Sequence, residues 1–587
     1  MRKTKFTCLS LGMLKISAHI FISFLLAIIS ILSFVRNSAD IQKSIRKGLP
    51  ALDEWYYQKI YSYSKSLMDS SQPFVDSTQY SNKRIEILNF GDLFYRLVFK
   101  LLPNDISVAY FVSTLVLLTL WIFIITFLVL RVGKNNYIAS ALISVVSIML
   151  FFGNSRLPNN EYPFARIISP QLVGLIWILT TLLILKTMNE ESRSAKSNIL
   201  IFLSYSFLIF FASFTYLYLL LSILGTLLAL ILNQFRKRLI GVPLLVILAS
   251  LVGSAPFLYL NFQKLNDTRF IEASHRMGLV ESRAPGGGLT IILCLLCVFV
   301  LFIIKNTKFN FQDSIRNTLN LSSLGILIAS QSNLVTNVSI QFSYHFEIFA
   351  LINCLILLSL ILKKLADQFT FTNQTILTKL IYTVAFFTLM PTIFFTLREF
   401  EPSKEHLVKI QKSMEMNFED ESNLIVDVNG LQSTLRVYSK SRIYFQEDMI
   451  PYGYTNNEIL DRYFISSGCS DKLTNDSLKQ SLVYYIEAPK QKGESLQRYL
   501  KFMNLESEFR FLYDPLLKIS SKRNESVNEY IKDLRIRLQP SNCLDVARQN
   551  EIDFILFDEH SEWGRIVESE SLSKSSLGFE GIFFTRI

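Results

Sequence analysis

Charged residues are scarce in this chain of 587 residues. Only 18% of the residues are Asp, Glu, Lys or Arg, whereas 50% are hydrophobic. An ordinary soluble domain carries about 25% charged residues. Several runs of roughly 16 to 25 apolar residues contain no charge, and a helix of that length crosses about 30 Å of hydrocarbon. The low charge therefore excludes an ordinary soluble protein and indicates a polytopic membrane protein embedded in the bilayer.

The sequence also lacks the common signatures of soluble enzymes. It contains no zinc-binding, Ser-His-Asp or nucleotide-binding pattern, no internal repeat and no low-complexity linker. The glycine run 286–288 is not followed by the Lys-Ser/Thr pair of a phosphate loop and stands where an apolar run begins, so we interpret it as a hinge. We expect no cofactor. No residue pattern indicates a metal site, although the binding of a divalent metal ion stays open as an alternative.

Cysteine is rare, with six residues in the whole chain. Cys294 and Cys297 form a C-x-x-C pair, but they lie inside an apolar run with no second pair nearby. That position favours small buried hydrophobic residues over a metal or redox site. Cys469 and Cys543 lie in the polar C-terminal part and would be able to pair if that part is outside the cytoplasm. The sequence alone does not decide between a disulfide and two free thiols at Cys469 and Cys543.

The apolar runs predict eleven membrane-spanning helices. The first run is similar to a signal peptide, but it is long and no small-residue cleavage site precedes Arg36, so we interpret it as a retained span. The run 199–232 is too long for one helix, and a tight turn at 213–215 divides it in two. The spans are expected at residues 14–35, 107–130, 137–152, 171–185, 199–232 (two), 239–260, 289–304, 319–335, 346–362 and 380–397.

The net charge of +11 is distributed unevenly. The first 398 residues contain 35 Lys and Arg against 17 Asp and Glu, whereas the remaining residues contain 24 against 31. The short basic turns between spans all fall on the side of the N-terminus, which predicts a cytoplasmic N-terminus in a multi-pass protein of the inner or plasma membrane. Since the basic residues form no single block, we expect no nucleic-acid partner.

Two domains are expected. Residues 1–398 form a transmembrane domain, whose outer loop 36–106 contains two amphipathic segments that predict interfacial helices. Residues 399–587 form an extracytoplasmic soluble α/β domain. Its short apolar runs predict strands at residues 423–426, 482–486, 554–557 and 582–584. Helices are expected between them at residues 403–416, 458–465, 526–538 and 543–550.

An adjacent acidic pair, Asp53 and Glu54, stands among aromatic residues soon after the first predicted span. Loss of hydration near a membrane interface raises the pKa of a carboxyl group and makes its carboxylate a stronger base. We therefore regard Asp53 and Glu54 as candidate catalytic residues. A structural role is the alternative, because acidic residues also favour the N-terminus of a helix, where they complement its dipole.

Basic residues on the predicted outer loops are the second set of candidates. Guanidinium groups match phosphate oxygens in geometry and charge, and phosphate-linked lipids present such oxygens at this boundary. Ordinary surface charge beside the headgroups is the alternative interpretation for each residue. The candidates for binding a lipid phosphate or a substrate are Arg156, Arg166, His275, Arg276 and Arg283.

A polar segment at the boundary of a later span adds His345 to these candidates. Residues 331–337 and 341–347 contain many amides and hydroxyls, which are costly inside a membrane unless they line a wet cavity. His345 and its neighbour Glu347 would contribute to such a polar site. A re-entrant turn that satisfies its own amides is equally compatible with the pattern.

The order of these parts resembles the GT-C superfamily of integral membrane glycosyltransferases. Members have one span, a long outer loop with an early acidic residue and interfacial helices, many further spans and an outer α/β domain. Two stretches of the membrane half are similar as well. Gly91-Asp92-Leu93-Phe94-Tyr95-Arg96 leads into the second span, and Phe164-Ala165-Arg166-Ile167-Ile168-Ser169-Pro170-Gln171 precedes the fourth.

This resemblance implies transfer of a sugar from a polyprenyl-phosphate carrier to an extracytoplasmic acceptor, with inversion at the anomeric carbon. Asp53 corresponds to the family's first-loop acid and would take the acceptor's proton, with Glu54 beside it. Arg166 and Arg283 would hold the departing phosphate. The Leu-Asp-Glu-Trp context of Asp53 departs from better-known members. Two other functions stay open: a lipid or solute transporter, and a non-catalytic assembly protein whose C-terminal domain binds an envelope partner.

Overall fold

The computed structural model describes most of the helical bundle and of the C-terminal part. The described residues are 16–28, 30, 94, 101, 106–132, 136–152, 171–189, 194–237, 241–264, 266–276, 280–281, 287–305, 307, 311–336, 338–339, 343–368, 422–428, 442–445, 454–470, 482–577 and 581–587. The predicted boundary at residues 398–399, the eleventh predicted span and the interfacial segments of the loop 36–106 lie outside these ranges, apart from isolated residues.

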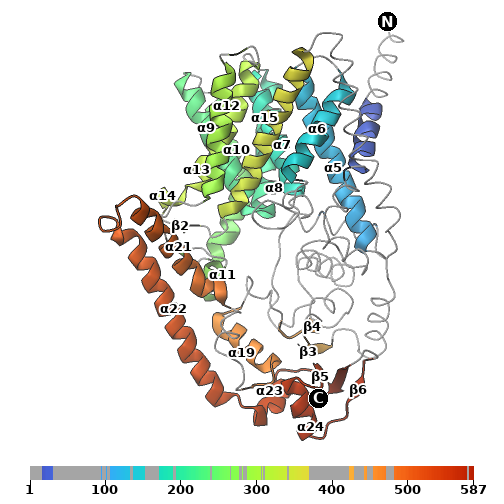
Figure 1. Ribbon diagram of the computed structural model, residues 1–587, viewed down its shortest axis with the longest axis vertical. Helices are drawn as coiled ribbons and strands as arrows, with labels where there is room; N and C mark the ends of the chain where they lie inside the picture. Colours follow the sequence, from blue (N-terminus) through green and yellow to red (C-terminus); the bar gives the residue numbers. More distant parts are fainter. Residues whose placement is uncertain are drawn as a thin grey trace.

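The long helices of the first 368 residues lie side by side in one bundle (Figure 1). Many exposed side chains on these helices are apolar, as contact with lipid requires, and each helix satisfies its own backbone hydrogen bonds inside a bilayer. The helices are α5 (Ile106–Leu130), α6 (Tyr137–Phe152), α7 (Val173–Asn189), α8 (Ala195–Thr215), α9 (Leu217–Arg236), α10 (Gly241–Lys264), α12 (Gly288–Lys305), α13 (Asp313–Ser330) and α15 (Glu347–Gln368).

This bundle confirms the predicted class, a polytopic α-helical membrane protein. Among the described residues, six helices are long and apolar enough to cross a membrane. Three shorter apolar helices accompany them, namely Ile16–Ile28, Tyr137–Phe152 and Val173–Met188. The predicted number of eleven spans is not confirmed. The predicted division of the run 199–232 is confirmed, with the break at Tyr216 between α8 and α9.

Glycine and polar side chains determine how closely these helices approach one another. A Cβ atom at Gly325 of α13 would lie 2.3 Å from the Cα atom of Thr226 in α9, so only glycine permits this crossing. Asn353 of α15 accepts a 3.1 Å hydrogen bond from the indole of Trp177 in α7 and donates a 3.0 Å bond to the hydroxyl of Ser322 in α13. Inside a bilayer, burial of apolar surface does not by itself hold two helices together, so such hydrogen bonds stabilise the contact.

Successive helices of the bundle run in opposite directions, so alternate connections gather at the same end. Figure 1 shows α11 (Thr268–Arg276), α14 (Asn333–Thr336) and β2 (Val338–Ser339) at the end of the bundle that is nearer the C-terminal part. The 3-10 helix η3 (Ser343–Phe346) begins four residues after β2, and its His345 is hydrogen-bonded to Tyr216, so η3 and the break at Tyr216 lie at this end too. We call this region the domain-facing end of the bundle.

The C-terminal part contains a five-stranded mixed sheet in the order β4-β3-β5-β7-β6. The strands are β3 (Asn423–Asp427), β4 (Arg442–Ile443), β5 (Phe554–Asp558), β6 (Ser575–Ser576) and β7 (Ile582–Arg586). β3 pairs in parallel with β4 and β5, whereas β7 pairs antiparallel with β5 and β6. Alternate side chains point to opposite faces, so Ile425 and Ile555 enter one apolar core and Leu424 and Leu556 another.

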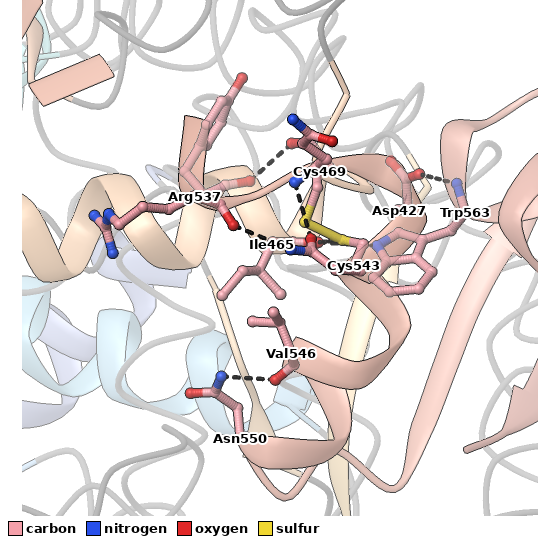
Figure 2. The surroundings of a disulfide bond; sticks show 12 residues. Asp427, Ile465, Cys469, Arg537, Cys543, Val546, Asn550 and Trp563 are labelled. Carbon is pink, nitrogen blue, oxygen red and sulfur yellow. Dashed lines mark hydrogen bonds between the residues drawn. A yellow bond between two sulfur atoms is a disulfide. The ribbon is translucent and has the colours of Figure 1, made fainter. Parts of the chain in front are cut away.

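Helices complete the larger of these two cores and confirm the predicted α/β class. They are α19 (Asn456–Ser466), α21 (Val483–Phe502), α22 (Arg510–Arg537), α23 (Cys543–Gln549) and α24 (Glu562–Ser569). A disulfide joins Cys469, just after α19, to Cys543 at the start of α23, which decides the question that the sequence left open. Figure 2 shows this disulfide beside Trp563, whose indole donates a 3.1 Å hydrogen bond to the carbonyl of Ile465.

The comparison with the sequence corrects one predicted element. The strands at 423–426, 554–557 and 582–584 and the helices at 458–465, 526–538 and 543–550 are confirmed. The predicted strand at 482–486 is wrong, because these residues begin α21. Leu482 and Ile486 are both buried and are one helical turn apart, so both enter the core from one face of this helix. The predicted helix at 403–416 lies outside the described residues.

Candidate functional site

Three of the eight candidate site residues lie within the described part of the chain. His275 and Arg276 are the last two residues of α11, and His345 lies in η3. All three therefore belong to the domain-facing end of the bundle, where Figure 1 shows α11. The candidates Asp53, Glu54, Arg156, Arg166 and Arg283 lie outside the described residues, so their roles stay predictions.

The backbone break at Tyr216 places two tyrosines at this end. Tyr216 has extended dihedral angles, with φ −162° and ψ 115°. Its N–H donates to the carbonyl of Ala212 in α8 at 3.0 Å, and its own carbonyl accepts from the N–H of Leu219 in α9 at 3.0 Å. A single residue therefore ends one helix and begins the next, and the rings of Tyr216 and Tyr218 stand 5.3 Å apart between centroids.

His345 is bound between these two tyrosines. The hydroxyl of Tyr216 shares a hydrogen bond with Nδ1 of His345. The ring of Tyr218 stacks on the imidazole, with 4.8 Å between centroids and 23° between planes. Phe346 packs edge-on against Tyr218 at 5.2 Å. Tyr218 and Phe346 are buried, whereas Tyr216 and His345 are half-buried, so the apolar rings support a polar pair that reaches the surface. We call these four residues the aromatic–histidine cluster.

Two short strands connect the segment after α11 with the segment before η3. β1 (Val280–Glu281) pairs antiparallel with β2 (Val338–Ser339), with Val280 opposite Ser339. β1 begins four residues after Arg276, and β2 ends four residues before η3. The pairing therefore brings the connection that contains α11 and the connection that contains His345 to one place on the domain-facing end.

This arrangement suits the binding of a polar group at the boundary of an apolar bundle. A phenol hydroxyl donates and accepts hydrogen bonds, and an imidazole near neutral pH takes up or releases a proton. Stacked aromatic rings also fix the orientation of the imidazole, which limits the entropy lost when it binds a partner. Within the described residues, no group of three or more His, Cys, Asp or Glu side chains is placed to hold a metal ion.

Arg276 occupies a different environment from the one expected of a lipid-binding residue. Its side chain is fully buried where α11 meets the C-terminal part. Nη1 donates a 2.6 Å hydrogen bond to Oδ1 of Asn456, and Nη2 donates a 2.5 Å bond to the carbonyl of Tyr454. Burial lowers the pKa of Arg276 to about 10, and the nearby carboxylate of Glu272 opposes this shift. The guanidinium thus remains charged at neutral pH and connects the bundle to α19.

The other residues of α11 extend this contact. Glu272 accepts a 2.5 Å hydrogen bond from the backbone N–H of Asn456, and Arg269 lies 3.9 Å from a carboxylate oxygen of Glu458. His275 packs its ring 6.4 Å from that of Tyr485 in α21. The structure therefore assigns Arg276 and His275 contacts within the protein, and their proposed contact with a lipid phosphate stays a prediction.

Tyr216 and Tyr218 were not among the candidates from the sequence. Their signal is the pair of phenol rings that flank Leu217 within an apolar run, directly after the predicted turn at 213–215. A tyrosine at a span boundary is common, because the ring lies in the headgroup region. Only the approach of η3 in three dimensions distinguishes these two from an ordinary interfacial pair.

Comparisons with known proteins show a similarity to a solved structure. No family model matches the chain, and no curated protein matches it. The crystal structure of ArnT from Cupriavidus metallidurans bound to undecaprenyl phosphate is similar to this structure over 96% of this chain and 97% of that chain. The sequence identity is 11% and the TM-score is 0.49. A similarity at this level assigns neither an activity nor a ligand to the chain.

Proposed function

We propose that the chain is a membrane glycosyltransferase that moves a sugar from a polyprenyl-phosphate carrier to an extracytoplasmic acceptor. The observation that carries this proposal is the aromatic–histidine cluster, a hydrogen-bonding group on the domain-facing end of an apolar bundle. A lipid-linked sugar has a chain that belongs in the bilayer and a polar headgroup that belongs at this boundary. Other amphiphilic lipids share these two requirements, and the resemblance to GT-C glycosyltransferases favours the lipid-linked sugar among them.

The chemistry follows the resemblance to GT-C glycosyltransferases. The acceptor hydroxyl oxygen attacks the anomeric carbon while its proton passes to Asp53, with Glu54 as the neighbouring carboxylate. The bond between the sugar and the carrier phosphate breaks, and the phosphate leaves with the electron pair. Arg156, Arg166 and Arg283 would compensate the charge that grows on the phosphate. His345, oriented by Tyr216, would donate a hydrogen bond to the sugar or to the phosphate.

The disulfide supports the proposed location of the C-terminal part. Disulfides persist in oxidising compartments and are rare in the cytosol. The pairing of Cys469 with Cys543 therefore favours an extracytoplasmic position for residues 422–587, at the face where a polyprenyl-linked sugar would be used. This location agrees with the cytoplasmic N-terminus that the basic turns predict.

A transfer assay with the purified full chain in lipid nanodiscs tests the proposal. Polyprenyl-phosphate-linked sugars are supplied as a panel, and the release of free polyprenyl phosphate is measured with and without cell-envelope acceptors. We expect release with at least one carrier, and its loss by a factor of about a thousand in Asp53→Asn, since a general base accounts for rate factors of this order. Asp69→Asn, in the same loop, is the matched control and should retain activity.

Two results would contradict different parts of the proposal. Full activity of Asp53→Asn would remove Asp53 as the base but leave the transferase intact. Absence of release with every carrier and acceptor, from protein whose disulfide and fold are intact, would reject the transferase itself. Binding of an envelope component without turnover would then favour the non-catalytic assembly function.

A further inference from the structure

The hairpin formed by α21 and α22 ends in a group of exposed aromatic residues. Among the described residues of the C-terminal part, the exposed large hydrophobic side chains are Tyr499, Phe502, Met503, Phe509, Phe511 and Ile536. All of these except Ile536 fall between Tyr499 and Phe511, where α21 ends and α22 begins. We call residues 499–511 the hairpin tip. Single exposed hydrophobic residues are common on proteins, but such a concentration marks a binding surface.

The two helices below the tip are firmly packed, so the exposed residues do not reflect a loosely built region. A Cβ atom at Gly493 of α21 would lie 2.9 Å from a methyl group of Leu517 in α22, which shows how closely the helices approach. Leu496, Leu500 and Tyr513 form a small buried core directly beneath the tip. Phe502 and Phe511 nevertheless point outward and are 86% and 66% exposed.

The base of the hairpin rests on the bundle. The ring of Tyr485 in the first turn of α21 faces His275 of α11 at 6.4 Å. Arg523 of α22 donates a 2.9 Å hydrogen bond to the carbonyl of Tyr485 and stacks its guanidinium over the same ring. From Tyr485 to Phe502 a helix extends about 25 Å at 1.5 Å per residue. The tip is therefore held at a fixed distance from α11.

The hairpin turns back towards the bundle. In Figure 1, α21 runs from the region of α11 to its connection with α22, and this connection lies at the level of α14 along the long axis of the molecule. α14 contains Leu334 and Val335, and Val335 is 86% exposed. Exposed apolar side chains next to the end of a membrane bundle mark the depth at which lipid begins. The tip thus lies at the height expected for the headgroup layer.

The composition of the tip also fits a lipid surface. Aromatic side chains concentrate at membrane–water interfaces, where the ring is apolar and its edge tolerates water. Within the tip, Lys501 and Arg510 are balanced by Glu506 and Glu508, so the aromatic rings and not a net charge carry the argument. A protein partner would not require the tip to lie at this level.

We propose that the hairpin tip docks into the headgroup layer of the leaflet on the domain-facing side, with Phe502 and Phe511 inserted among the lipids. The C-terminal part would then be held to the membrane at two places, through α11 at the base of the hairpin and through lipid at its tip. This inference does not depend on the proposed transferase activity.

Site-directed fluorescence tests the docking. Phe502→Cys and Ile536→Cys are made in a Cys8→Ser background and labelled with the environment-sensitive dye NBD, in nanodiscs that hold one full chain each. Ile536 is the matched control, because it is 76% exposed on α22, the second helix of the hairpin, but near the end that is remote from the tip. Cys294, Cys297 and Cys354 are buried, and the chain without an added cysteine measures their background labelling.

We expect blue-shifted emission at position 502 and at least twofold stronger quenching there than at position 536 by lipids that carry a nitroxide near the headgroup. Phe511→Cys should behave like Phe502→Cys, which protects the test against a local effect of one label. Water-like emission at both tip positions, with quenching no stronger than at position 536, would overturn the proposal. A protein partner or a second copy would then be the occupant of the tip.

Discussion

Arg276 of α11 donates a 2.6 Å hydrogen bond to the side-chain oxygen of Asn456 in α19, two residues that are 180 positions apart in the sequence. The same guanidinium also satisfies the carbonyl of Tyr454. Glu272, one turn earlier in α11, accepts the backbone N–H of Asn456 and lies 3.8 Å from Arg276. The contacts of Arg276 and Glu272 therefore hold the start of α19 against α11 at the end of the bundle.

Removal of this guanidinium should loosen the contact. In Arg276→Ala the side chain of Asn456 and the carbonyl of Tyr454 each lose a charged donor while they remain buried, which costs about 2 kcal/mol or more. We expect hydrogen exchange at the first amides of α19 to become about thirtyfold faster in the full chain.

Arg269→Ala is the control. Arg269 makes only a half-exposed ion pair at 3.9 Å, so its loss should leave the exchange nearly unchanged. Equal exchange in both variants would show that Arg276 does not hold the contact.

The crossing of α9 and α13 should be sensitive to a single methyl group. In Gly325→Ala the new Cβ atom would lie 2.3 Å from the Cα of Thr226, so the helices must separate. We expect a loss of about 1 to 3 kcal/mol, the cost of overpacking a close contact, measured as a lower unfolding temperature in detergent. Gly241→Ala, where no atom lies within 4 Å of the new Cβ, should unfold at the temperature of the wild type or above. Equal effects of the two substitutions would contradict the packing argument.

The spans could be predicted because their signal does not depend on tertiary structure. An uncharged apolar run has one stable form in a bilayer, and α6 begins and ends at the predicted residues, 137 and 152. The prediction for α13 started at residue 319, six residues late. Asp313 and Arg316 open this helix and pair at 2.6 Å, so charge does not mark its boundary. Hydropathy alone places a helix end where the charges begin.

Features that depend on contacts between residues far apart in the sequence could not be predicted from it. The run 482–486 has the composition of a strand, but Leu482 and Ile486 share a buried cluster with residues of α22, which suits a helical face. The sequence favours a lipid phosphate as the partner of Arg276, because its loop is basic and lies at a span boundary. Its partners Tyr454 and Asn456 are far away in sequence, and nothing near Arg276 indicates them. The same holds for the approach of His345 to Tyr216, 129 residues earlier.

The two tyrosines beside His345 should differ in their effect on function. Tyr216→Phe removes the hydrogen bond to Nδ1 and leaves the ring, so the imidazole loses its orienting partner. If the cluster binds the substrate headgroup, kcat/KM for sugar transfer should fall about tenfold, which corresponds to about 1.4 kcal/mol for one hydrogen bond. Tyr218→Phe keeps the ring that stacks on His345 and should stay within about threefold of the wild type. A larger loss in Tyr218→Phe than in Tyr216→Phe would reject the orienting role of Tyr216.

Asp427 makes the C-terminal part sensitive to pH. It is the last residue of β3, and its Oδ2 accepts a 3.4 Å hydrogen bond from the backbone N–H of Trp563 in α24 (Figure 2). Burial raises the pKa of Asp427 to about 6, and the neighbouring carboxylates of Asp558 and Glu562 act in the same direction. Hydrogen bonds from Trp563 and Ser561 oppose the shift without cancelling it. The folded state therefore binds a proton at Asp427 more tightly than the unfolded chain does.

This difference in proton affinity gives the direction of the pH effect. Stability contributed by protonated Asp427 is fully present below the unfolded pKa of 3.8 and is lost as the pH rises through the folded value of about 6. Between pH 5 and pH 8 the loss amounts to about 1.4 kcal/mol. Asp427→Asn retains an acceptor for Trp563 but carries no charge, so it should remove this loss and be more stable than the wild type at pH 8.

Urea-dependent protease cleavage of the C-terminal part in the full chain measures both effects. Asp545→Asn, with a side chain 69% exposed, is the control and should follow the wild type across the range. A pH dependence in Asp427→Asn equal to that of the wild type would show that another group is responsible.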